Sequence, residues 1–207
     1  MTMRQIQTPN VTPARRRVLQ LLGAAGALLL AGCGQNKPHF NSVDITGADY
    51  GKGFALTDHN GQQRALGDFA GKVVVLFFGY TQCPDVCPST MLELVEVKKL
   101  LGADGGRLQA LFVTLDPERD TPELLKAYMT NFDPMFVALR PTPEQLPVLA
   151  KEFKIYFKKV PGAGANNYTL DHSAGSYVFD TQGHLRLFTR YGSGAAVLAA
   201  DLAQLMR

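Results

Sequence analysis

The sequence has no charge excess of the kind that marks a nucleic-acid-binding protein. Its formal net charge is +3, from 21 Lys and Arg against 18 Asp and Glu. Residues 1–32 carry four arginines and no acidic residue, so the rest of the chain has 21 − 4 = 17 basic residues against 18 acidic ones. The positive charge therefore belongs to the N-terminus, and nothing in the remaining sequence favours a nucleic-acid partner.

The N-terminus also lacks an apolar run long enough to span a membrane. The run over residues 18–30 has 13 residues and is interrupted only by Gln20, whereas a spanning helix needs about 20. Three consecutive arginines at positions 15–17 precede it. A basic segment followed by a short apolar core is typical of a signal peptide, which we predict over residues 1–32.

The apolar run ends in a motif with a specific chemical meaning. The sequence Leu30-Ala31-Gly32-Cys33 resembles the bacterial lipoprotein box, in which the cysteine is acylated and the chain is cut before it. This resemblance implies a lipidated Cys33 and a protein anchored to a membrane of the bacterial cell envelope, facing the periplasm. The polar residues 33–41 would then form a lipidated tether, and residues 42–207 one domain. The alternative is an uncleaved anchor with an incidental cysteine.

The order of apolar patterns predicts an α/β fold. Residues 73–79 form a continuous apolar run, which is typical of a strand covered on both faces. Further strands are expected at 108–115, 137–139 and 155–160, helices from Pro88, Thr121, Thr142 and Ala195, and hairpins at 54–66 and 176–189. This order resembles the thioredoxin fold in its peroxiredoxin-like variant, which has an N-terminal β-hairpin extension and a central insertion.

Only three cysteines are present, and two of them lie where function is expected. Lipidation would consume Cys33, which leaves Cys83 and Cys87. This Cys-x3-Cys pair lies between a buried strand and the following helix, where the ligand sites of open α/β sheets gather. A helix N-terminus favours anions, so we expect it to lower the pKa of Cys87 and to promote a thiolate there.

Three uses of the Cys83–Cys87 pair compete. A structural disulfide is common in exported proteins, but so short a loop adds little constraint to the chain. A thiol–disulfide or peroxide enzyme would use a sulfur as nucleophile. A soft-metal site needs another donor, and His172 supplies it, because in a thioredoxin-like fold the loop before the penultimate strand faces the dithiol. Two thiolates and an imidazole suit Cu(I), and the same donors can hold Cu(II).

Two absences count against the enzyme classes. Disulfide oxidoreductases of this fold usually carry a cis-proline facing the dithiol, whereas residues 171–173 here are Asp-His-Ser and the nearest preceding proline is Pro161. Peroxidases need a threonine three residues before the attacking cysteine, and those two positions hold Tyr80 and Pro84. These features favour the metal site over both kinds of enzyme.

Three segments together resemble the SCO/SenC family, in the family's order and approximate spacing. They are Gly79-Tyr-Thr-Gln-Cys-Pro-Asp-Val-Cys-Pro88, Val113-Thr-Leu-Asp-Pro-Glu-Arg-Asp-Thr121 and Asp171-His172-Ser173. The resemblance implies a thioredoxin-like fold and a copper-binding assembly factor, which delivers copper to cytochrome c oxidase or prepares the cysteines of its copper site. The implied partners are an oxidase subunit or another copper chaperone.

By the same resemblance, Cys83, Cys87 and His172 are the copper ligands, and the two cysteines form a redox-active disulfide when oxidised. The alternative function is a periplasmic thiol–disulfide oxidoreductase. The loop at 116–120 is interpreted as a capped, ion-paired structural element, with partner recognition as the other possibility. Asp171 could orient His172 from behind, as carboxylates do for many metal-binding histidines.

Overall fold

The computed structural model describes residues 38–163 and 167–207 of the chain. The predicted signal peptide over residues 1–32 and the predicted lipidation of Cys33 lie outside them. Residues Phe40–Arg207 form one compact unit. Within the described ranges, no helix combines the length and the apolarity needed to cross a membrane.

A mixed sheet of eight strands forms the centre of this unit, in the order β1-β10-β9-β4-β5-β6-β2-β3. Strands β4, β5 and β6 are parallel, and the other pairs are antiparallel. The strands of this sheet are β1 (Val43–Asp44), β2 (Ala55–Asp58), β3 (Gln63–Ala65), β4 (Val73–Gly79), β5 (Leu108–Thr114), β6 (Val137–Arg140), β9 (Ser176–Phe179) and β10 (Leu185–Thr189).

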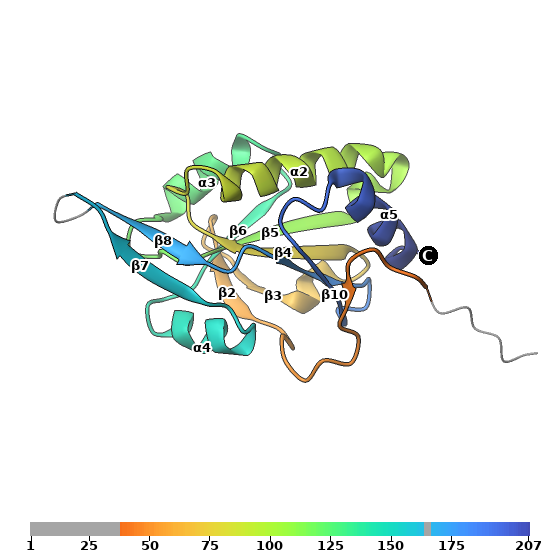
Figure 1. Cartoon of the computed structure of the whole chain (residues 1–207), viewed down its shortest axis with the longest axis horizontal. Coiled ribbons are helices and arrows are strands. Elements are labelled where there is room, and N and C mark those ends of the chain that lie inside the picture. The colour runs from red at the N-terminus through yellow and green to blue at the C-terminus, as the bar shows by residue number, and fades with distance from the viewer. Residues whose placement is uncertain (1–37, 164–166) are drawn as a thin grey trace, which may run out of the picture. The chain divides into compact units, whose positions relative to one another are not determined.

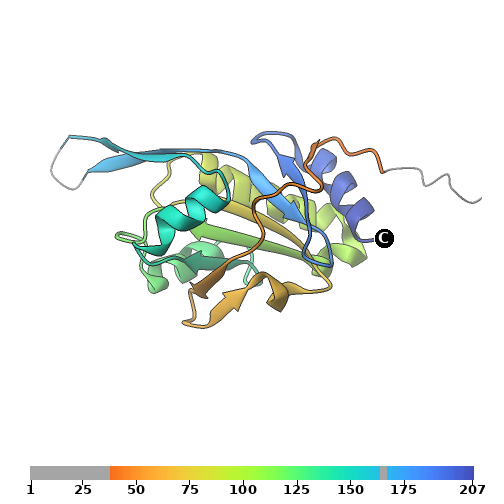
Figure 2. The same ribbon diagram turned by 90° about the horizontal axis from the view of Figure 1, so that it is seen from below.

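Helices cover both faces of the sheet, as Figures 1 and 2 show. Helices α2, α3 and α5 lie on one face and α4 on the other. Every residue of β4 and β5 is buried, as the continuous apolar run predicts. The helices are α2 (Val86–Leu100), α3 (Pro122–Thr130), α4 (Gln145–Glu152) and α5 (Ala195–Leu205), and two 3-10 turns span Leu66–Phe69 and Gly102–Arg107. The α/β, thioredoxin-like fold predicted from the sequence is confirmed.

Local signals explain several element boundaries. Thr121 begins α3 as expected: its hydroxyl accepts a hydrogen bond from the Leu124 amide, and Pro122 occupies the first helical position. The β2–β3 hairpin turns at Asn60-Gly61, and the buried Asp58 carboxylate accepts from the amide of Asn60. His59, a turn residue that its position in the sequence would leave in solvent, instead ties the hairpin to β6, because its Nδ1 accepts from the Ala138 amide at 3.0 Å.

The main departure from the predicted elements is a second, separate sheet. Strands β7 (Phe157–Pro161) and β8 (Tyr168–His172) pair only with each other, and Phe157 lies opposite His172. The sequence predicted a loop leading up to His172, but β8 includes it. Figures 1 and 2 show this β7–β8 arm extending away from the main sheet. His172 therefore lies on a rigid strand, at the end nearest the body.

Candidate metal centre

The three residues predicted as metal ligands come together in the structure. The donor atoms of Cys83, Cys87 and His172 all lie within 4.8 Å of one another. His172 Nε2 is 3.6 Å from Cys87 Sγ. No other trio of His, Cys, Asp or Glu in the described ranges is close enough to hold an ion. Residues 85 positions apart in the chain thus form one candidate site.

The two cysteines lie at the junction of β4 and α2, with different exposure. Cys87 is in the first turn of α2 and is fully buried, whereas Cys83 precedes the helix and is partly exposed. Both are free thiols. A Cβ atom at Gly79 would come within 2.8 Å of Cys87 Sγ, so only glycine at the end of β4 lets this sulfur approach. The buried sulfur is therefore held against the strand end, and the other faces outward.

The electrostatics of the pair reverse one expectation from the sequence. The pKa of Cys83 falls to about 4, first because the Cys87 thiol donates a hydrogen bond to its sulfur, and further because backbone amides donate to it as well. The pKa of Cys87 rises, because of the same hydrogen bond and because of burial. The prediction of a lowered pKa at Cys87 is wrong. The helix N-terminus acts on the other sulfur, since the Cys87 amide points at Cys83 Sγ at 3.4 Å.

The orientation of His172 follows from a backbone contact. Its Nδ1 lies 2.9 Å from the Ser173 carbonyl oxygen. A carbonyl can only accept, so Nδ1 carries the proton and Nε2 presents a lone pair toward the sulfurs. Asp171 is exposed on the opposite side of β8. The proposed orienting role of Asp171 is therefore wrong, and the Ser173 carbonyl performs it.

Aromatic rings and a cavity complete the surroundings of the donors. The rings of Phe77 and Tyr80 meet the His172 ring edge to face, with centroids 6.1 and 6.0 Å away. These buried rings fix the imidazole on one side. A cavity of about 330 Å³ adjoins the site and is lined by Cys83, His172 and Tyr80. The donors are thus reachable by a small ligand or a partner's side chain.

The loop at 116–120 supports the site from behind. The buried Asp120 carboxylate accepts hydrogen bonds from the Thr81 amide at 3.1 Å, the Thr81 hydroxyl at 2.6 Å and the Thr114 hydroxyl at 2.5 Å. Arg119 pairs with Asp116. The predicted capped, ion-paired loop is confirmed. Sequence reasoning missed the role of Thr81, which is anchored by Asp120 only two residues before Cys83.

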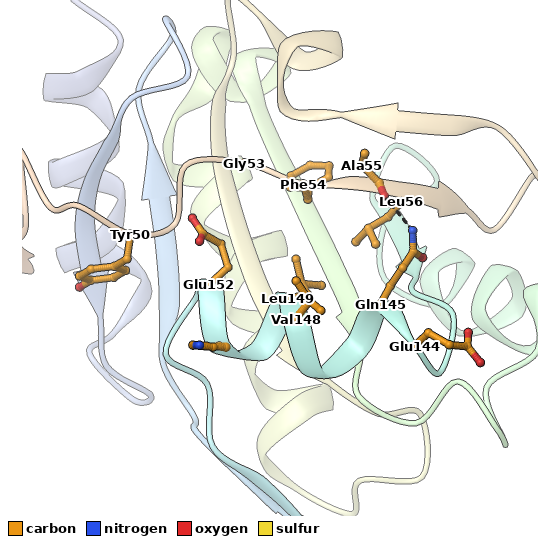
Figure 3. Close-up of a pocket in the computed structure, with 11 residues that line it drawn as sticks. Tyr50, Gly53, Phe54, Ala55, Leu56, Glu144, Gln145, Val148, Leu149 and Glu152 are labelled. Carbon is orange, nitrogen blue, oxygen red and sulfur yellow. Dashed lines mark hydrogen bonds between the residues drawn. The ribbon is translucent and has the colours of Figure 1, made fainter.

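A larger groove lies elsewhere on the molecule. It measures about 610 Å³ and runs between β2 and α4, with apolar walls from residues such as Phe54, Val148 and Leu149. Figure 3 shows these side chains along the groove, together with the Gln145–Ala55 hydrogen bond. None of its lining residues is a cysteine or a histidine. The groove therefore offers neither of the soft donor types that form the Cys83, Cys87 and His172 trio.

Comparisons with known proteins agree with the geometry. The sequence profile of SCO1/SenC matches residues 43–207. Protein SCO2 homolog, mitochondrial, of Bos taurus is 36% identical over 177 residues, which cover 84% of this chain and 65% of that protein. The SCO2-like protein of Rickettsia felis is 34% identical and covers 80% of this chain and 83% of that one. The structure of Bradyrhizobium japonicum ScoI with copper bound is similar with a TM-score of 0.69 and 37% identity, and covers 76% of this chain and 99% of that chain.

Proposed function

The chain belongs to the SCO1/SenC family, and on that premise we propose that it is a copper-binding assembly factor for cytochrome c oxidase. It delivers copper to the oxidase or prepares the cysteines of the oxidase's copper site. The observation that carries the proposal is the convergence of two sulfurs and one imidazole nitrogen within 4.8 Å. That the related Bradyrhizobium japonicum ScoI binds copper supports the choice of metal.

The donors fit Cu(I) in type and in protonation. Soft thiolates and imidazole are the ligands that Cu(I) prefers in proteins, and the same set can hold Cu(II). Cys83 is already a thiolate at neutral pH, because its pKa is about 4. Cys87 carries the proton of the pair and must release it when a metal binds. His172 directs Nε2 toward the sulfurs, where it can serve as the third donor.

Asymmetric exposure suits a carrier. Cys87 is fixed in the first turn of α2, whereas Cys83 and His172 border the open cavity. A partner's sulfur or nitrogen can therefore reach a bound ion from the cavity side. The buried Cys87 sulfur would be the last of the three donors to release the ion. The partner expected from the family is an oxidase subunit or another copper chaperone.

A redox switch follows from the same two sulfurs. Oxidation of Cys83 and Cys87 to a disulfide would release two electrons to an external oxidant and one proton from the Cys87 thiol, and would remove both thiolate ligands. We therefore propose that copper binding requires the reduced pair. The disulfide would also let the protein exchange thiols with cysteines of a partner.

For the location of the protein we keep the interpretation of the N-terminal sequence. A lipid on Cys33 would anchor the domain to a membrane of the bacterial envelope on its periplasmic side, with residues 33–41 as tether. Mass spectrometry of the membrane-extracted protein should show a chain that starts at Cys33 and carries the lipid mass. A mature protein that keeps residues 1–32 would contradict this.

The alternative function is a thiol–disulfide oxidoreductase. The low pKa and partial exposure of Cys83 favour it, because a thiolate is the attacking form. Against it, the position facing the dithiol holds His172, whose nitrogen is aimed at Cys87. A metal site needs the imidazole as a further donor, whereas a dithiol exchange requires only two sulfurs and one thiolate.

The decisive experiment is a competitive Cu(I) titration of the reduced and the oxidised protein. We expect one Cu(I) to bind tightly to the reduced protein and none to the protein whose Cys83–Cys87 pair is oxidised. Cys83→Ser should also abolish tight binding, whereas His184→Ala, a change at an exposed histidine outside the site, should not. Equal uptake by oxidised and reduced protein would show that copper binds elsewhere.

A further inference from the structure

We propose that Arg119 is a positioning residue for copper binding: it clamps β8 to the loop that carries Cys83 and thereby holds His172 within reach of the two sulfurs. The inference rests on the proposed copper function and assigns a new role within it. Arg119 touches none of the three donor residues in the contacts described below. It acts through Tyr168 at one end of β8 and through Gln82, the neighbour of Cys83.

The β7–β8 arm needs such a clamp because no strand of the main sheet pairs with it. Its position relative to the cysteine loop is set by side chains and by its attachment at the base. Along β8, Tyr168, Leu170 and His172 face the body, while Thr169 and Asp171 are exposed. A shift at Tyr168 is therefore transmitted along one short, hydrogen-bonded strand to His172.

Arg119 makes three contacts that join the two segments. Its Nη1 donates to the Tyr168 carbonyl at 2.9 Å and to the Gln82 side-chain oxygen at 3.1 Å. Its guanidinium carbon lies 3.5 Å from the centre of the Tyr168 ring. The planar guanidinium thus stacks on one arm residue and bridges it to the residue before Cys83.

A buried carboxylate fixes the guanidinium in turn. Asp116 is 2% exposed and pairs with Arg119 Nε, while its other oxygen accepts from the Tyr168 hydroxyl at 2.8 Å. The Asp116 carboxylate therefore holds both the Arg119 guanidinium and the Tyr168 side chain on which that guanidinium stacks. Because this ion pair is largely removed from water, its geometry is more sharply defined than that of a surface pair.

Arg119 and His172 both pack against the ring of Tyr80. The Tyr80 ring lies 5.9 Å from the Arg119 guanidinium carbon, and its centroid is 6.0 Å from that of His172. Tyr80 is itself buried, so it fills the space between them. Release of Arg119 would loosen Tyr168 and Tyr80 together, of which the first belongs to β8 and the second contacts the imidazole.

Lys159 offers a matched control on the same ring. Its ammonium lies 4.7 Å from the centre of the Tyr168 ring and pairs with Glu118 of the same loop. Unlike Arg119, it is exposed, belongs to the arm itself and has no contact with Gln82 among those described. Removal of Lys159 deletes a cation at Tyr168 but leaves the link to the cysteine loop intact.

The test compares Cu(I) affinity of the full-length protein and its variants by competitive titration. Arg119→Lys keeps the positive charge beside Asp116 but cannot bridge the Tyr168 carbonyl and Gln82 at once. We expect it to weaken Cu(I) binding roughly 10–100-fold, as is usual when a residue that orients a metal ligand is changed. The Cu(II)–thiolate absorption should shift toward that of His172→Ala. Lys159→Met should bind copper like the wild type.

A double mutant separates an effect of Arg119 through His172 from an effect on the cysteines or on the stability of the fold. If Arg119 acts through His172, then Arg119→Lys should cause no further loss of affinity in a His172→Ala background. A loss of the same size in both backgrounds would overturn the proposal, because Arg119 would then act on the cysteines or on the fold. Unchanged affinity and absorption in the single mutant Arg119→Lys would overturn it as well.

Two further measurements distinguish a failure of the proposed copper function from a failure of the Arg119 proposal. Cys83→Ser tests the copper function itself: if it binds copper as tightly as the wild type, the proposed function fails, whatever Arg119 does. If Arg119→Lys fails to fold by near-ultraviolet circular dichroism, Gln82→Ala replaces it, because Gln82 is exposed and its change severs only one end of the clamp. Gln82→Ala should weaken Cu(I) binding in the wild-type background but cause no further loss in the His172→Ala background. A loss of the same size in both backgrounds, or no loss in either, would reject the clamp.

Discussion

Single sulfur and nitrogen atoms decide what the site can do. Cys83 and Cys87 are chemically identical, yet one is held as a thiolate and the other as a thiol. The difference arises because the Cys87 thiol and the Cys87 amide both point at Cys83 Sγ, while Cys87 itself is fully buried. The reduced pair therefore presents one exposed nucleophilic ligand and one protected ligand to an incoming ion.

This asymmetry predicts an unusual pH profile of thiol reactivity. With a pKa of about 4, Cys83 should be alkylated by iodoacetamide at a nearly constant rate from neutral pH down to about pH 5, because the reactive thiolate is already fully formed. Mass spectrometry of the reduced protein would locate the label, and the buried Cys87 should stay unlabelled. A rate that rises through about pH 8.5, the ordinary range of a thiol, would contradict the assignment.

The same shift links stability to pH. The folded pKa of Cys83 lies below its unfolded value, so between about pH 4 and pH 8.5 the unfolded chain binds a proton at this site that the folded chain does not. The contribution of Cys83 to folding is thus fully present above the unfolded pKa and is lost as pH falls through the folded pKa. Reduced protein should gain stability from this site as pH rises across that window.

At the scale of elements, the loop after β5 holds the cysteine loop in place. Asp120 is fully buried and accepts three hydrogen bonds, two from Thr81 and one from Thr114. The backbone pairing between β4 and β5 reaches Gly79 and Leu115, and the Asp120 carboxylate continues the connection beyond it to Thr81. The position of Cys83, two residues after Thr81, therefore depends on a side chain that follows the next strand.

Asp120→Ala should consequently destabilise the protein by about 2–4 kcal/mol, because the buried Thr114 hydroxyl and the two part-buried donors of Thr81 lose their acceptor at once. Urea unfolding of the reduced protein, monitored by circular dichroism, measures the loss. Glu118→Ala is the matched control from the same loop. Its ion pair is exposed, so the change should stay within about 0.5 kcal/mol. Similar values for both variants would show that Asp120 does not support the site.

Elements also show how far the sequence could predict the structure. The run at 73–79 predicts β4 because only a strand covered on both faces tolerates seven consecutive buried residues. The strand character of β8 could not be predicted, since it depends on pairing with β7 across the connecting residues. The links of Arg119 and Asp120 to the cysteine loop and to β8 were equally hidden, because the partners in those segments, Thr81, Gln82 and Tyr168, lie 37 to 49 positions away in the sequence.

For the molecule as a whole, the fold brings together donors that the sequence could name but not place. The Cys-x3-Cys pair and His172 were predicted as ligands from their positions in a thioredoxin-like order. What the sequence could not decide was which sulfur is buried and what orients the imidazole, because Gly79 and the Ser173 carbonyl act through three-dimensional contact. The central sheet fixes one sulfur, and the separate β7–β8 arm carries the nitrogen.

This division between a rigid body and an attached arm is the basis for a carrier. A third donor on the arm closes the site around an ion, and its withdrawal opens the site to a partner. A dithiol enzyme does not require that donor. The role of His172 therefore separates the two functions more sharply than either cysteine, which both functions need.

The most direct test is a competitive Cu(I) titration of the wild type and His172→Ala, with a thiol-reductase assay on the same samples. We expect His172→Ala to lose at least about tenfold in copper affinity, since removal of a ligand should cost no less than disturbing the residues that orient one. The fold should remain, and both proteins should turn over disulfides negligibly. Unchanged copper affinity together with robust disulfide turnover in both proteins would contradict the carrier function and establish a thiol–disulfide oxidoreductase.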